Sequence, residues 1–153
     1  MLDLRIALAI HVISVIWWIG GLAMVTTVFL PGLRQGFHPD PGGALAYIER
    51  HFAPQARVAV LLVGVSGAYM LTRLHAWSWL RMGRFWWVDA MLGYWLLFAV
   101  MLFVLEPLGA HGWMKRQAAT DSGRLRRMQR VHALMLALGL VVVMGAVLGN
   151  HRF

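Results

Sequence analysis

The chain has 153 residues, of which 60% are hydrophobic and 13% are charged. A soluble domain of this length needs far more polar surface, so the composition excludes one and indicates an integral membrane protein. The absence of cysteine excludes disulfides, thiolate metal ligands and cysteine nucleophiles. The net charge of +8 is better explained by basic loops that touch anionic lipid than by nucleic-acid binding. We therefore expect a lipid bilayer as partner and no nucleic acid.

Four long apolar windows each match the ~20 residues that cross ~30 Å of hydrocarbon as a helix. The first, Ile6 to Leu30, carries no formal charge. It is too long for a signal peptide and has no Ala-x-Ala site after it, so it predicts a permanent span. Pro31 and Gly32 are expected to end this helix, and Pro54 to lie in the first turn of the second one. We predict one membrane domain, residues 1–153, with spans at about 5–30, 54–74, 85–105 and 131–149.

The connections between these spans are short, which predicts an all-α, antiparallel, up-down-up-down four-helix bundle. Residues 44–52 are expected to form a short interfacial helix that leads into the second span. The loops after the first and third spans hold nine of the 14 lysine and arginine residues. The positive-inside rule therefore predicts both termini on the non-cytoplasmic side. We expect the membrane to be a bacterial inner (plasma) membrane.

A histidine inside an apolar run is costly unless it has a partner, so His11 is the first candidate for a functional site. His11, Ser14, Trp18 and Gly21 recur every three or four residues and therefore share one helix face, which we expect to point into the bundle. Trp18 lies in mid-span, where it either packs in the core or forms the wall of a cofactor pocket. His11 either binds a cofactor or bonds to a core carbonyl.

The other histidines lie nearer the ends of the spans. His51 comes just before Pro54, and His132 lies only two residues after Arg130, so both are expected in the cytoplasmic half. His11 lies in the outer half, so His11 and His132 are not expected to hold one iron from two sides. Four histidines lie near the membrane interfaces, where placing an imidazole costs little free energy. They are His38, His75, His111 and His151.

Two histidines at equal depth on different helices would be the strong sign of a haem. His11 with His75 is one possible pair in the outer half. His51 with His132 or His111 is a possible pair in the inner half. Spacing alone does not select between them.

Glu106 closes the third span at the end where the helix dipole disfavours a carboxylate. We therefore expect it to need a cation or a proton, and the arginines of the following loop are placed to supply the cation. Asp89, in the first turns of the same span, is favoured by the dipole.

The segment from His11 to Leu22, His-Val-Ile-Ser-Val-Ile-Trp-Trp-Ile-Gly-Gly-Leu, resembles the first span of the copper-resistance D (CopD) superfamily. The exit Phe29-Leu-Pro31, followed by Arg34, fits the same pattern, and Arg57 to Leu74 looks like that family's next span. The resemblance implies a small integral membrane protein with redox or metal-linked chemistry. The related HemJ branch binds haem b at a first-span histidine, which implies this role for His11.

Haem b in a helical bundle needs one or two imidazoles, an apolar slot and basic groups for its propionates. Haem b is the expected cofactor. The candidate metal ligands are His11 and His132, and the wider candidate pocket is His11, His132, His51, His75 and Trp18.

Two alternatives remain open. Copper transport would use methionine and histidine, which suit copper(I), but the ten methionines show no pair on one face within a span and are better explained as flexible core filler. A non-catalytic assembly subunit of a larger complex, or a homo-oligomer, would use the packing pattern Gly145-x-x-x-Gly149. Hydrolase motifs are absent, which disfavours a hydrolase. Whether the chain is an enzyme of another class stays open.

The orientation gives the first testable prediction. A topology reporter fused within residues 76–84 should report the non-cytoplasmic side, and one fused within residues 35–40 should report the cytoplasm, because the positive charges are concentrated there. A cytoplasmic signal from residues 76–84 would contradict the predicted orientation.

Overall fold

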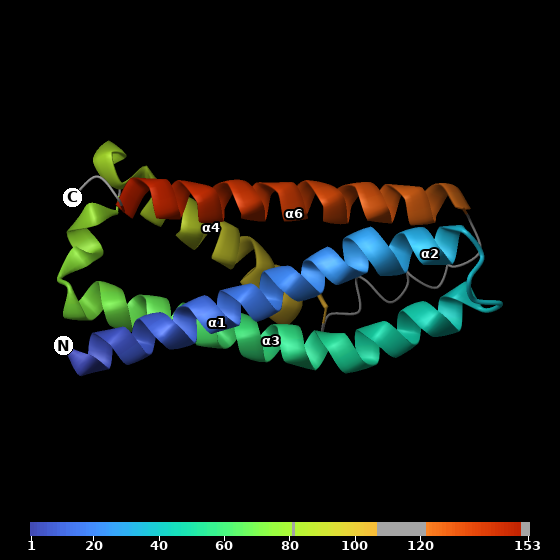
Figure 1. Ribbon diagram of the computed structural model, residues 1–153, viewed down its shortest axis with the longest axis horizontal. Helices are drawn as coiled ribbons and strands as arrows, with labels where there is room; N and C mark the ends of the chain where they lie inside the picture. The colour runs from blue at the N-terminus through green and yellow to red at the C-terminus, as the bar shows by residue number, and fades with distance from the viewer. Residues whose placement is uncertain (81, 107–121, 151–153) are drawn as a thin grey trace.

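The computed structural model describes residues 1–80, 82–106 and 122–150, and every regular element in these ranges is a helix (Figure 1). The predicted all-α class is therefore confirmed. In chain order the elements are α1 (Leu2–Met24), η1 (Val25–Phe29), α2 (Leu30–Arg34), α3 (Pro41–Arg73), η2 (Ala76–Trp79), η3 (Gly83–Phe85), α4 (Trp86–Val100), η4 (Met101–Leu105) and α6 (Ser122–Asn150).

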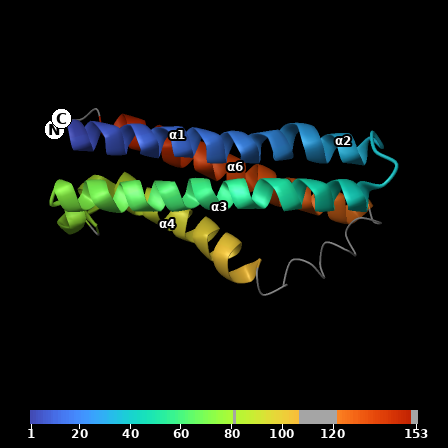
Figure 2. The same cartoon turned by 90° about the horizontal axis from the view of Figure 1, so that it is seen from below.

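Four helical stretches in the described part of the chain are long and apolar enough to cross a membrane. They are Leu2–Arg34, Pro41–Arg73, Gly83–Leu105 and Leu125–Gly149. Successive stretches run in opposite directions, so the start of α1 and the end of α6 lie at the same end of the bundle (Figures 1 and 2). The antiparallel up-down-up-down arrangement is confirmed, whereas the side of the membrane on which the termini lie stays a prediction.

The first helix does not end at Pro31 and Gly32, as the sequence predicted, but continues to Arg34 through α2. The turn before the proline widens into the π-helix η1, in which the Leu30 N–H donates to the Val25 carbonyl. Proline cannot donate to a carbonyl in the preceding turn and its ring crowds that turn, so a wider turn is a physical way to keep the helix going. Gly36 then ends the segment with a positive φ of 77°.

The second span is longer than predicted at its start. Helix α3 begins at Pro41, where the Asp40 side chain accepts a hydrogen bond from the Gly43 N–H at 3.0 Å. The short interfacial helix expected at residues 44–52 is the first part of this same helix. Pro54 lies inside α3 rather than in its first turn.

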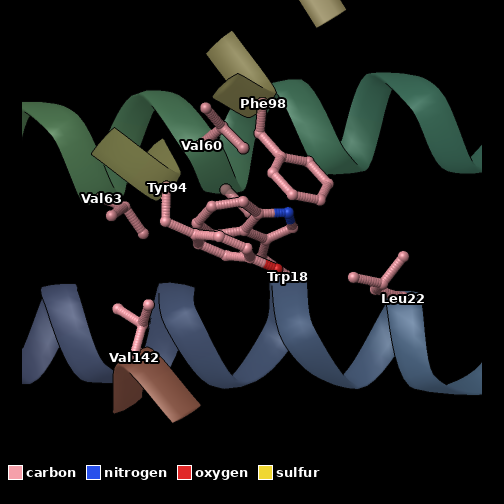
Figure 3. Packing of buried hydrophobic residues seen from close by; sticks show 8 residues of the cluster. Trp18, Leu22, Val60, Val63, Tyr94, Phe98 and Val142 are labelled. Atoms are coloured by element: carbon pink, nitrogen blue, oxygen red, sulfur yellow. The ribbon is translucent and has the colours of Figure 1, made fainter. Parts of the chain in front are cut away.

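The centre of the bundle is an aromatic cluster built on Trp18 of α1 (Figure 3). The centroid of the Trp18 ring lies 4.8 Å from the ring centroid of Phe98 and 5.4 Å from that of Tyr94, both on α4. Val60 of α3 is fully buried beside them and Val142 of α6 closes the cluster. All four long helices therefore meet at Trp18, which explains why the predicted face of α1 points inward.

Glycines let aromatic rings of α4 lie directly on the neighbouring helices. A Cβ atom added at Gly64 of α3 would lie 2.5 Å from the Trp95 ring, and one at Gly145 of α6 would lie 2.6 Å from the Trp86 ring. Gly149 meets the Trp87 ring in the same way. The pattern Gly145-x-x-x-Gly149 is therefore used inside this chain, by α4.

The contact at Gly64 gives a prediction about stability. Gly64→Ala should lower the thermal unfolding midpoint in detergent, because the new methyl group displaces a ring whose Nε1 donates to the Val60 carbonyl at 2.8 Å. Overpacking of this kind costs ~1–3 kcal/mol.

The matched control is Gly93→Ala in α4, where a Cβ atom meets nothing within 4 Å. Alanine is the better helix former by ~0.5–1 kcal/mol, so this control should leave the midpoint unchanged or raise it. Equal destabilisation by both substitutions would contradict the packing described here.

Candidate functional site

His11 lies on the seam between α1 and α3, with its imidazole half-buried. Its Nδ1 atom is 3.1 Å from the Val63 carbonyl oxygen and 3.0 Å from the Ser66 hydroxyl. Gly67 lies beside the ring, where an added Cβ atom would meet the His11 Cε1 atom at 3.4 Å, an ordinary contact distance. The predicted inward position of His11 is therefore found, and its contacts come from one neighbouring helix.

These contacts define which ring nitrogen carries the proton. A carbonyl oxygen only accepts, so a hydrogen bond to Val63 requires the proton on Nδ1. The Ser66 hydroxyl donates to carbonyls of its own helix and accepts at its oxygen. In the neutral imidazole Nε2 then carries a lone pair, and the described residues place no hydrogen-bond donor on it.

Polar contacts at the end of the bundle hold the same seam. The Asp3 carboxylate accepts hydrogen bonds from the Tyr69 hydroxyl and the Arg73 Nε, both at 3.0 Å. The Arg73 guanidinium also lies 2.9 Å from this carboxylate through its Nη2 atom. At the other end of the seam the Phe52 ring of α3 covers Gly21 of α1. The position of His11 relative to α3 is thus fixed on both sides.

The other predicted histidines do not share the environment of His11. His51 is exposed on α3, where its Nδ1 contacts the Tyr47 carbonyl at 2.8 Å and its ring lies over the Tyr47 ring. His132 contacts the Met128 carbonyl of its own helix at 2.9 Å. Both rings are therefore turned toward the carbonyl four residues earlier, with His51 exposed and His132 half-buried.

His75 is exposed at the end of α3, with a positive φ of 53°. It lies twelve residues beyond Val63, the contact of His11, which is ~18 Å along a helix. The two histidines are therefore not at equal depth, and this predicted pair is not formed. His111 and His151 lie outside the described residues.

Trp18 is 5% exposed and its ring is covered by Tyr94 and Phe98 (Figure 3). Of the two interpretations offered for it, core packing is the one that its contacts support. Of the methionines considered for copper, Met91, Met101 and Met135 pack against the same cluster.

A pair of charged residues was missed by the sequence analysis. The Arg57 Nη2 atom of α3 lies 3.3 Å from the Glu106 carboxylate, and its Nε donates to the Leu102 carbonyl of η4 at 3.3 Å. Glu106 was instead expected to find its cation in the loop that follows it. The sequence does contain a signal for this pair: Arg57 and Glu106 are isolated opposite charges near the ends of apolar runs, and each needs a partner of opposite charge.

Within residues 1–80, 82–106 and 122–150 no group of three or more His, Cys, Asp or Glu side chains is placed to hold a metal ion. His11 therefore belongs to no such group within these ranges. Comparison with protein-family models, curated proteins and solved structures gave no match to this chain.

The hydrogen bonds of His11 give a spectroscopic prediction. Nitrogen NMR of the imidazoles in the cofactor-free protein should show His11 as the neutral tautomer with its proton on Nδ1, because the Val63 carbonyl accepts it. The signal is assigned by its loss in His11→Gln. A proton found on Nε2 would contradict the geometry.

Proposed function

We propose that this chain is a CopD-like membrane protein that binds haem b, and that Nε2 of His11 is the atom that would hold the haem iron. The observation that carries the proposal is the anchored imidazole: Nδ1 faces the Val63 carbonyl and the Ser66 hydroxyl, and Nε2 remains available. A histidine that ligates a metal usually donates its other ring N–H to a carbonyl or carboxylate, which fixes the tautomer and the ring. The resemblance of the first span to the CopD superfamily supports the same residue.

The residues around His11 fit a haem held by one imidazole. Gly67 lies beside the ring, and the neighbouring side chains of α1 are apolar apart from Ser14. When bound, haem b would supply one-electron chemistry, and this chain would position it and exclude water.

The two alternatives have weaker support. A copper site would need soft ligands beside His11, whereas three of the span methionines pack in the aromatic cluster. The glycine face that suggested an assembly subunit is covered by Trp86 and Trp87 of the same chain. Neither alternative gains an observation of its own, and we propose no reaction or substrate.

Purification from haem-replete cells tests the proposal. We expect an intense Soret absorption from the native protein and its near-complete loss in His11→Ala, because no nearby side chain replaces the Nε2 ligand. Helix content and unfolding should change little, since one interhelical hydrogen bond in a membrane averages only ~0.6 kcal/mol.

His51→Ala is the matched control: it removes an imidazole from α3 that is exposed and bonded only within its own helix, so haem content should be unchanged. Ser66→Ala keeps the ligand but removes one contact of Nδ1, and should weaken haem binding ~10-fold or more. Full haem content in well-folded His11→Ala would end the ligand hypothesis. A colourless native protein would favour copper or the subunit alternative, which a copper assay then separates.

A further inference from the structure

Three arginines meet at the end of the bundle where α2 and the first turns of α6 pack together. Arg34 of α2 and Arg126 and Arg130 of α6 line a hollow of about 380 Å³, with Gln129 and Ala133 completing its wall. The Arg34 Nη1 atom donates to the Gln129 amide oxygen, which joins the two helices across the hollow. This site is separate from the His11 seam.

The charge in this hollow is uncompensated within the described part of the chain. No carboxylate lines it, and no ion pair between described residues includes Arg34, Arg126 or Arg130. Three like charges held close together repel one another, so an anion that enters the hollow relieves this repulsion. Guanidinium groups match the oxygens of phosphate in bidentate geometry, and several of them can share one phosphate.

The helix faces around the hollow identify the kind of phosphate. Arg126, Arg130 and Ala133 recur every three or four residues along α6, and the same face continues to Leu140 and Met144. Leu140 is 55% exposed and Met144 is 57% exposed, as expected for side chains that face hydrocarbon. A basic hollow at the end of an exposed apolar helix face suits a ligand with an anionic head and an apolar tail.

We propose that this hollow binds the phosphodiester headgroup of an anionic phospholipid, with its acyl chains along the apolar face of α6. The arginines contact the phosphate oxygens, and the Arg34–Gln129 bond keeps α2 against α6 while they do so. By the positive-inside rule this end of the bundle faces the cytoplasm, where the leaflet carries anionic lipid. The site does not depend on haem binding.

Native mass spectrometry of the full-length chain, purified in neutral detergent and delipidated, tests the proposal. Phosphatidylglycerol and phosphatidylcholine are added separately, and the fraction of protein with one bound lipid is measured for each. We expect the native chain to prefer phosphatidylglycerol. Arg126→Gln and Arg130→Gln should each reduce this preference about 5-fold, the factor that corresponds to ~1 kcal/mol for one basic residue at a membrane surface.

Arg127→Gln is the matched control, because it removes one exposed charge from the same turn of α6 but does not line the hollow. The preference should be retained in this variant, and circular dichroism should show equal helix content in all three. Equal losses in Arg127→Gln and Arg130→Gln would overturn the site in favour of diffuse attraction, as would a native chain without preference.

A competition experiment distinguishes the lipid from free phosphate. Inorganic phosphate and glycerophosphoglycerol, the headgroup without acyl chains, are added to the complex with phosphatidylglycerol. If the lipid is the ligand, neither should displace it at concentrations comparable to that of the lipid. Displacement by either at such concentrations would overturn the lipid assignment and identify a site for a soluble phosphate.

Discussion

Every polar group inside this bundle has to find its partner within the protein, because hydrocarbon offers none. The partners are mostly backbone carbonyls, of the same helix for Thr26 and Ser66 and of a neighbouring helix for Tyr94 and Trp95. Tyr94 donates to the Met135 carbonyl of α6 at 3.0 Å, and Trp95, the next residue of α4, donates to the Val60 carbonyl of α3 at 2.8 Å. Two adjacent side chains thus attach α4 to both of its neighbours. A shift of α4 along either neighbour would leave a buried donor unpaired, which fixes its height in the bundle.

The same constraint explains why glycines and large aromatic rings occur in pairs. Helices in lipid gain little from burying apolar surface against one another, so their association depends on close packing and hydrogen bonds. The Trp95 ring has to lie on Gly64 for its Nε1 to come within hydrogen-bond distance of the Val60 carbonyl. On the side of α4 that faces α6, the Tyr94 hydroxyl lies over Gly139 for the same reason. Each glycine therefore makes a specific hydrogen bond possible.

Among the described residues, the number, order and direction of the four membrane-spanning stretches could be predicted from the sequence, and so could the inward face that carries His11 and Trp18, because these depend on length and local periodicity. The pairing of Arg57 with Glu106 could not, because spacing along one chain does not show which helices are neighbours. The continuation of the first helix past Pro31 was also missed, since the π-turn that accommodates the proline has no separate sequence signal. In the first case the local sequence lacks information about a distant part of the chain. In the second it lacks information about a rare local geometry.

The hydrogen bond between His11 and Val63 is not required to satisfy the backbone of α3. In a regular α-helix the Val63 carbonyl already accepts the N–H four residues later, and the Ser66 hydroxyl lies 3.2 Å from it as well. The carbonyl is therefore satisfied without the histidine, and the beneficiary of the bond is the imidazole. A hydrogen bond between two helices needs only a serine or threonine hydroxyl. Neither of these side chains has a second polar atom comparable to Nε2. The feature that distinguishes histidine from those residues is Nε2, and holding Nδ1 in place fixes the direction of its lone pair.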